Sequence, residues 1–384
     1  MSRATVALVL VVFFVVSIFT NTLGALLPDI IGTFALSLTA AGLLPFAFFA
    51  AYGVASIPAG LLTERTSEKQ VMVGAFALAL VSSLAFALVP RYPVAIASLF
   101  VTGVAMAAVQ VAAQPLLRVA GGEARFAFFS TLGQLAFGAA SFVSPRIYTA
   151  LTLRSLPWTS LYWLFAALAA VLVVVLSVAK LPRVERKDDE RAGSLDAHRA
   201  LLRGGAARWF ASIFLYVGIE QGISSWLSQF LATYHGVDPR TGGANAVSWF
   251  WGLMTLGCVS GLVVLKVFDS RKVLVVHAVL AIVLFAIGLF GPTPIAILAL
   301  PAVGLVASVM WPIIFALALN SVRSHQGTLS GILCTAIVGG AVVPLVIGRV
   351  GDRLGLRAGM TLLFLNLGWI LAIGFWAKPV VKER

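Results

Sequence analysis

The sequence predicts an all-α membrane protein with twelve transmembrane helices in two pseudo-symmetric six-helix bundles. Of its 384 residues, 60% are hydrophobic and only 11% are charged, whereas soluble domains carry roughly 25% charged residues. The apolar residues gather in runs long enough for bilayer-crossing helices, which need roughly 20 residues each. Six such runs precede a charged segment at the middle of the chain, and six follow it. These observations exclude a soluble globule, a disordered chain and a disulfide scaffold.

The apolar runs and the breaks between them define the individual helices. Clusters such as Pro90–Pro93 and Gly291–Pro294 break a helix and leave room for a short turn. The first run continues through Leu27 without a small-residue cleavage pattern, so we expect a membrane span there and not a cleaved signal peptide. The expected spans are residues 4–34, 38–62, 70–90, 93–119, 125–152, 155–181, 207–235, 240–267, 272–291, 293–322, 327–352 and 357–379.

The charged segment divides the chain into an N-terminal bundle of residues 1–181, a linker of residues 182–206 and a C-terminal bundle of residues 207–384. Equal halves joined by one charged linker indicate an internal duplication. If the termini, the linker and alternate loops share one face, that face carries 20 basic residues and the other carries seven. Because Lys and Arg accumulate on the cytoplasmic side, we expect both termini and the linker in the cytoplasm. Orientation also accounts for the net charge of +13, so no nucleic-acid partner is expected.

Glu220 is an acidic residue deep within an expected span. It lies 13 residues into the seventh span, about 20 Å along the helix and therefore near the middle of the bilayer. An unpaired carboxylate there is strongly destabilised, so we expect Glu220 to be protonated much of the time. A carboxyl that gains and loses a proton as its surroundings change is what a proton-coupled carrier requires. The alternative is a structural carboxyl that bonds to a neighbouring helix.

Polar side chains four residues apart, which share one helix face, occur in the first, fourth and seventh spans. Each group alone could equally hold neighbouring helices together. That the first, fourth and seventh spans all carry such a face favours a cavity shared by these spans. The residues are Ser17 and Asn21 in the first span, Gln110, Gln114 and Arg118 in the fourth, and Tyr216, Glu220 and Ser224 beside Gln221, Ser225 and Gln229 in the seventh.

These side chains indicate a neutral, hydroxylated ligand. Amides donate and accept hydrogen bonds together and so suit the vicinal hydroxyls of a sugar, and aromatic rings can cover its apolar face. A multiply anionic substrate would need cations in the middle of the spans, whereas Arg118 and Arg146 lie toward the ends of theirs. The candidate substrate-binding residues are Asn21, Gln110, Gln114, Gln221, Ser225, Trp226 and Trp311, of which the aromatic ones are as often packing or interface residues.

Several catalytic motifs are absent from the sequence. It has no Gly-rich phosphate loop ending in Lys-Ser or Lys-Thr, no His-Glu-x-x-His zinc pattern and no Gly-x-Ser-x-Gly elbow. Cys258 and Cys334 lie inside apolar runs and indicate neither a disulfide nor a metal site. We therefore expect no enzymatic activity, no cofactor and no metal.

Six short motifs follow one another along most of the chain. They are Leu26-Leu27-Pro28 after Asn21, Ser56-Ile57-Pro58-Ala59-Gly60, Ala112-Ala113-Gln114-Pro115, Tyr216-Val217-Gly218, Pro312-Ile313-Ile314-Phe315, and Gly339-Gly340-Ala341 with Pro344, Gly348 and Asp352. With these motifs and its six-plus-six arrangement, the chain resembles the major facilitator superfamily, and within it the fucose–galactose–glucose:proton symporters. The resemblance implies alternating access, in which two bundles rock around a central substrate site.

The resemblance also implies a conformational latch in the loop after the second span. The superfamily pattern there is Gly-x-x-x-Asp-Arg-x-Gly-Arg-Lys, and charge pairing near helix ends is expected to stabilise one conformation. This chain matches the pattern at Gly60, Arg65 and Lys69 but has Glu64 in place of the Asp and Ser67 in place of the Gly. These departures are expected to weaken the latch.

A further departure concerns protons. The acids that fucose carriers place in the first and fourth helices are matched here by Gly24 and Gln110, so either coupling has moved to Glu220 or it is lost. We expect a proton-coupled carrier that imports a neutral monosaccharide, works as a monomer and resides in a bacterial inner membrane. The alternatives are a proton-driven exporter of drugs or metabolites, an uncoupled sugar facilitator, and a membrane receptor or scaffold.

Overall fold

The computed structural model describes residues 3–122, 126–182, 205–322 and 326–377, apart from the side chains of Glu64, 126–127 and 326–328. Throughout these ranges the regular secondary structure is helical. The first group of helices is α1 (Arg3–Asn21), α2 (Leu23–Phe34), α3 (Leu38–Arg65), α4 (Glu68–Leu88), α5 (Tyr92–Gly121), α6 (Phe126–Leu153) and α7 (Ser160–Val178). The second group is α9 (Ala207–His235), η4 (Pro239–Gly243), α10 (Ala244–Val267), α11 (Ser270–Phe290), α12 (Thr293–Ala307), α13 (Met310–Asn320), α14 (Gln326–Thr335), η5 (Ala336–Val338), α15 (Gly339–Leu354), α16 (Leu356–Thr361) and α17 (Leu363–Trp376).

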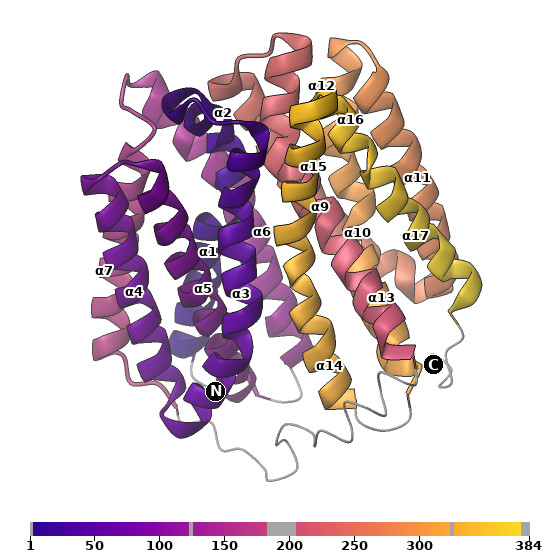
Figure 1. Cartoon of the computed structure of the whole chain (residues 1–384). Coiled ribbons are helices and arrows are strands. Elements are labelled where there is room, and N and C mark those ends of the chain that lie inside the picture. Colours follow the sequence, from indigo (N-terminus) through magenta and orange to yellow (C-terminus); the bar gives the residue numbers. More distant parts are fainter. Residues whose placement is uncertain (1–2, 123–125, 183–204, 323–325, 378–384) are drawn as a thin grey trace.

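These helices form two bundles that stand side by side (Figure 1). Ten helical segments of the described residues are long and apolar enough to cross a membrane. The more polar α6 and α9, with 28 and 29 residues, complete the twelve predicted spans, and the predicted fold class is confirmed. The expected linker, residues 182–206, lies almost entirely outside the described residues.

Four of the twelve spans are interrupted, which the hydropathy pattern did not predict. The first span breaks at Thr22, between α1 and α2. The tenth breaks at Ser308 and Val309, between α12 and α13. In the eleventh span the 3-10 segment η5 separates α14 from α15, and in the twelfth Leu362 separates α16 from α17. Pro312 follows the break in the tenth span and has no N–H to donate to the Ser308 carbonyl. By contrast, α5 continues through Pro115, although a proline inside a helix removes a backbone hydrogen bond.

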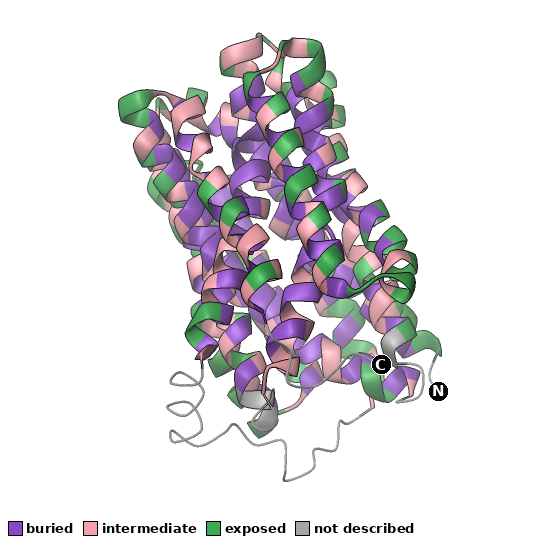
Figure 2. Ribbon diagram, turned by 90° about the vertical axis from the view of Figure 1, so that its right-hand side faces the viewer, coloured by how far each residue is buried: buried purple, intermediate pink, exposed green. Residues whose placement is uncertain are grey.

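The outer surface of the bundles is apolar. In Figure 2 the exposed residues recur along the outward-facing sides of the helices, and the buried ones face their neighbours. Among the exposed side chains are Val54, Val178, Leu298 and Leu365, each more than 70% accessible. Side chains of this kind are stable on a surface that contacts lipid.

The two bundles contact each other mainly through three helix pairs: α3 with α15, α6 with α10, and α2 with α9. We call the face at which α1 begins and α17 ends the terminal face, and the other end of the bundles the opposite face (Figure 1). At the opposite face, the Arg240 guanidinium of η4 pairs with the Asp29 carboxylate of α2 at 3.0 Å. Tyr148 donates a second bond to Asp29 at 2.7 Å, and the Thr149 hydroxyl donates to the Arg240 carbonyl at 2.8 Å.

The Asp352 carboxylate makes a further connection between the bundles at this face. It lies at the end of α15 and accepts hydrogen bonds from the backbone N–H groups of Leu38 at 2.7 Å and Thr39 at 2.8 Å. These groups belong to the first turn of α3, where helix N–H groups lack partners within the helix and the helix dipole favours a negative charge. One bundle therefore caps a helix of the other, and the opposite face is closed.

Asparagine at Asp352 should weaken this closure. The amide keeps one acceptor oxygen but loses the charge, and the loss is worth about 1–2 kcal/mol, or about five- to thirtyfold in favour of opening. A single cysteine at Thr20, in a chain without Cys258 and Cys334, should then react faster with a membrane-impermeant thiol reagent applied at the opposite face. Asp269→Asn is the matched control, because Asp269 caps α11 within one bundle. Equal labelling rates in the two variants would contradict the assignment.

Candidate functional site

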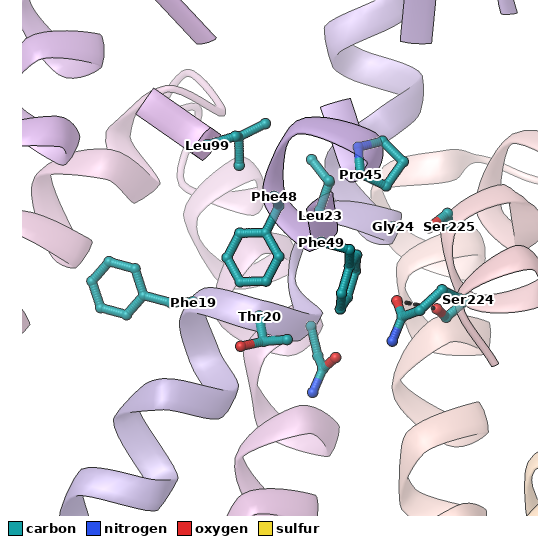
Figure 3. A pocket seen from close by; sticks show the side chains of 12 residues that line it. Phe19, Thr20, Leu23, Gly24, Pro45, Phe48, Phe49, Leu99, Ser224 and Ser225 are labelled. Atoms are coloured by element: carbon teal, nitrogen blue, oxygen red, sulfur yellow. Dashed lines mark hydrogen bonds between the residues drawn. The ribbon is translucent and has the colours of Figure 1, made fainter. Parts of the chain in front are cut away.

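A small cavity lies between the bundles where α1, α2, α3, α5 and α9 meet (Figure 3). Its volume is about 10 Å³, close to what one water molecule needs. Ligand pockets usually measure roughly 300–1,000 Å³, so the cavity is closed to a sugar in this conformation. The lining residues are Phe19, Thr20, Asn21, Leu23, Gly24, Pro45, Phe48, Phe49, Leu99, Gln221, Ser224 and Ser225.

Asn21 lines the cavity at the point where α1 ends. Its amide nitrogen donates to the Ser141 hydroxyl at 2.8 Å, and Ser141 lies 2.7 Å from the Ser17 hydroxyl. Its Oδ1 is buried and accepts no hydrogen bond among the described residues. A buried amide oxygen without a donor is costly, so Asn21 offers an acceptor that a hydroxyl-bearing ligand can satisfy.

Gln221, Ser224 and Ser225 line the cavity from the C-terminal bundle. All three are buried, and the Ser224 hydroxyl donates to the Gln221 Oε1 at 3.4 Å. Gly24 allows α2 to approach α9 here, because a Cβ at Gly24 would overlap with the Ser224 carbonyl group. An amide from each bundle therefore faces the same small space.

Glu220 immediately precedes Gln221 in α9, but its carboxyl does not line this cavity. It is partly buried and accepts a hydrogen bond from the Tyr216 hydroxyl at 2.7 Å. The same hydroxyl lies 3.1 Å from the Ala307 carbonyl at the end of α12. The carboxyl is thus held inside the C-terminal bundle, beside the break in the tenth span.

Gln110 and Gln114 lie on α5 away from the cavity. The Tyr52 hydroxyl of α3 donates to the Gln110 Oε1, which joins two helices of the N-terminal bundle. Gln114 is partly exposed, and no hydrogen bond joins it to a described residue. From Leu99, which lines the cavity, these amides are about 16 and 22 Å further along α5 toward the terminal face.

The two predicted aromatic candidates also lie outside the cavity lining. Trp226 is fully buried, and its indole N–H donates to the Pro344 carbonyl of α15 at 3.0 Å. Trp311 stacks on Phe315 with ring centroids 4.9 Å apart. Of the predicted binding residues, the structure brings together Asn21, Gln221 and Ser225.

The residues of the expected latch surround the end of α3. Arg65 is exposed at the last position of α3, and Gly60 lies four residues before Glu64 in the same helix. The Lys69 ammonium donates to the carbonyls of Ser177 and Ala179, both at 2.8 Å. A lysine on the last carbonyls of α7 caps that helix, and the Glu64 side chain lies outside the described residues.

Sequence reasoning missed the aromatic part of the cavity. Phe48 and Phe49 of α3 line the cavity, and Figure 3 shows Phe49 between Thr20 of α1 and Ser224 of α9. Their rings are 5.0 Å apart in an edge-to-face arrangement. A phenylalanine that lines a cavity cannot be distinguished by sequence from one that packs within an apolar span. The only local signal is the concentration of aromatic residues in Pro45–Phe49.

Comparison with known proteins places this architecture in a family. Residues 9–343 match the Major Facilitator Superfamily. The chain belongs to this superfamily. It is therefore an integral membrane transporter and not an enzyme, which confirms the resemblance in the sequence motifs.

Relatives and solved structures of the superfamily cover nearly the whole chain. A protein of Brucella abortus named glucose/galactose transporter is 32% identical over 368 residues, 91% of this chain and 88% of that protein. The L-fucose-proton symporter of Escherichia coli is 25% identical over 91% of this chain and 87% of its own. Crystal structures of the E. coli fucose:proton symporter and of a bacterial homologue of the lysosomal transporter Spinster share the fold. Their TM-scores are 0.69 and 0.77, at 21% and 14% identity, with at least 96% of each chain covered.

Proposed function

We propose that this protein carries a neutral monosaccharide across the membrane together with protons by alternating access. The observation that carries the proposal is the pair of buried amides, Asn21 and Gln221, that face one closed cavity from the two bundles. Amides and hydroxyls recognise sugar hydroxyls, and Phe48 and Phe49 offer an apolar surface beside them. Relatives named for glucose, galactose and fucose support this substrate class.

The size of the cavity supports a rocking mechanism. A site of about 10 Å³ cannot admit a sugar unless the bundles separate. The polar contacts of Asp29, Arg240 and Asp352 close the opposite face, so we propose that substrate enters from that face after these contacts break. On its way to the terminal face, the sugar then passes Gln114, which has no partner of its own among the described residues.

Glutamine at Glu220 should uncouple transport from protons. The amide resembles a protonated carboxyl but cannot release a proton, so uptake into vesicles should no longer respond to a pH gradient, while equilibrium exchange of labelled sugar continues. In the parent protein, an acidic medium on the uptake side should drive accumulation, and this accumulation should fall as that medium is made alkaline. Asp269→Asn is the control, because it makes the same change from carboxyl to amide at the exposed N-cap of α11. Undiminished accumulation by Glu220→Gln would exclude Glu220 as the coupling group.

A drug or metabolite exporter is the competing function, because the chain contains 26 phenylalanines and two of them line the cavity. Thermal unfolding of the purified protein in the presence of hexoses or of amphipathic compounds distinguishes the two. We expect stabilisation by hexoses. Stabilisation by amphipathic compounds alone would favour the exporter.

We also propose the setting in which the carrier works. The excess of basic residues on the terminal face favours both termini in the cytoplasm of a bacterial inner membrane. Residues 1–181 and 207–384 are proposed to move as two bodies joined by the linker 182–206. A monomer suffices, because both amides of the site come from one chain.

A further inference from the structure

The break in the tenth span leaves backbone carbonyls that side chains of other helices reach. The last residue of α12 is Ala307, and α13 begins at Met310. The Cys258 thiol of α10 donates to the Ser308 carbonyl at 3.6 Å, and the Tyr216 hydroxyl of α9 lies 3.1 Å from the Ala307 carbonyl. Three helices of the C-terminal bundle therefore meet at this break.

Tyr216 stands between the break and Glu220. Its hydroxyl lies 2.7 Å from the Glu220 Oε1 and 3.1 Å from the Ala307 carbonyl oxygen, but it has one proton to donate. Tyr216 is fully buried, so water does not supply an alternative partner. The two acceptors therefore compete for one donor.

We infer that Tyr216 is a positioning residue that transmits the protonation of Glu220 to the break between α12 and α13. An ionised Glu220 attracts the hydroxyl proton more strongly than a neutral carbonyl does, because hydrogen bonds to ionised groups are about twice as strong. When Glu220 is protonated, its own O–H donates to the tyrosine oxygen, and the tyrosine proton turns to the Ala307 carbonyl. The inference rests on the proposed role of Glu220 in proton coupling.

The surroundings make Glu220 the group whose charge decides this competition. Besides Tyr216 on its own helix, the titratable neighbour is Cys258 of α10, which interacts electrostatically with both Glu220 and Tyr216. The packed helices α12, α13 and α17 contain no titratable residue. On the other helices that contact α9, the remaining titratable residues are Cys334 of α14, Lys266 near the terminal end of α10, and Asp29, Arg240, Arg349, Asp352, Arg353 and Arg357 near the opposite face.

The break receives this change in hydrogen bonding at the point from which α13 starts. From Met310, α13 runs to Asn320 at the terminal face and packs against α9. A hydrogen bond gained or lost at Ala307 changes the angle at which α13 leaves the break. Release of the proton from Glu220 is thereby linked to the half of the tenth span that borders the terminal face.

Phenylalanine at Tyr216 tests the inference, because it keeps the ring and removes the shared hydroxyl. In reconstituted vesicles we expect labelled-galactose exchange to stay within about twofold of the parent, while accumulation driven by an acid gradient falls at least about tenfold. Galactose-induced proton uptake, recorded with a pH electrode, should fall in parallel. Tyr162→Phe is the matched control: Tyr162 is a buried tyrosine of α7, in the other bundle, and we expect its variant to accumulate normally.

Each other outcome overturns the inference. If Tyr216→Phe accumulates galactose normally while Glu220→Gln does not, coupling at Glu220 stands but the tyrosine does not transmit it. If both variants accumulate normally, the proposed coupling role fails as well. If Tyr216→Phe no longer exchanges galactose and also unfolds at a lower temperature than the parent, the hydroxyl has a structural role and does not transmit protonation.

Discussion

Alanine at Gly24 should stop the bundles from closing above the cavity. A Cβ at this position would overlap with the Ser224 carbonyl group and contact the Ser225 Cα, and backbone atoms cannot rotate out of the way. The helices α2 and α9 must then separate, at an overpacking cost of about 1–3 kcal/mol. This shifts the equilibrium about five- to 150-fold toward the conformation open at the opposite face. Sugar transport should slow by a similar factor, and a single cysteine at Thr20 should label faster from that face.

Gly32→Ala is the matched control for this prediction. Gly32 lies in the same helix, and a Cβ there meets no atom within 4 Å. Alanine in an exposed helix position is neutral or slightly stabilising, so transport should be unchanged. Equal transport by Gly24→Ala and Gly32→Ala would show that close contact of α2 and α9 is not needed.

Alanine at Gly339 should destabilise the C-terminal bundle itself. A Cβ at Gly339 would overlap with the Phe214 carbonyl group where the start of α15 crosses α9. Because both helices belong to one bundle, the clash cannot be relieved by rocking, and we expect a loss of about 2 kcal/mol or more in stability. Thermal unfolding of the purified protein measures this loss. Gly331→Ala in α14 is the control, since its Cβ meets no atom within 4 Å, and an equal loss in both variants would contradict the prediction.

The twelve spans could be predicted because the bilayer imposes a length and a composition on each helix. The breaks within them could not. Thr22 interrupts the first span without a proline or glycine at the break itself, and beyond the break α2 packs against α9 of the other bundle. The break in the tenth span has a local sign in Pro312, but seven prolines lie inside described helices that continue through them: Pro28, Pro45, Pro58, Pro115, Pro145, Pro301 and Pro344.

The candidate site was predictable in part for a related reason. Asn21, Gln221 and Ser225 stand out because polar groups are rare in apolar helices, and these three do meet at the cavity. Gln110 gives the same signal, yet its partner is Tyr52 of the neighbouring helix. A polar residue in a membrane span indicates a hydrogen-bonding partner, but the sequence alone does not show whether that partner is a ligand or another helix.

A charged contact between the bundles lies at the opposite face and not at the loop after the second span, where the latch was predicted. The pattern Gly-x-x-x-acid-Arg occurs at Gly60, Glu64 and Arg65 and again at Gly348, Asp352 and Arg353. The two copies end α3 and α15, helices that pack against each other. The superfamily pattern predicted the latch at the first copy. In the structure it is Asp352 of the second copy that caps α3, a helix of the other bundle.

The charges that close the opposite face lie where dissolved ions reach them. Arg240 is 57% exposed, and Asp352 is exposed at the end of α15. Mobile ions screen such interactions over about 10 Å at 0.1 M ionic strength, whereas the close approach of Gly24 to α9 involves no charge. The salinity of the surrounding medium therefore shifts the equilibrium of the empty carrier between its closed conformation and the one open at the opposite face. The packing around Gly24 makes a contribution to this equilibrium that does not depend on salt.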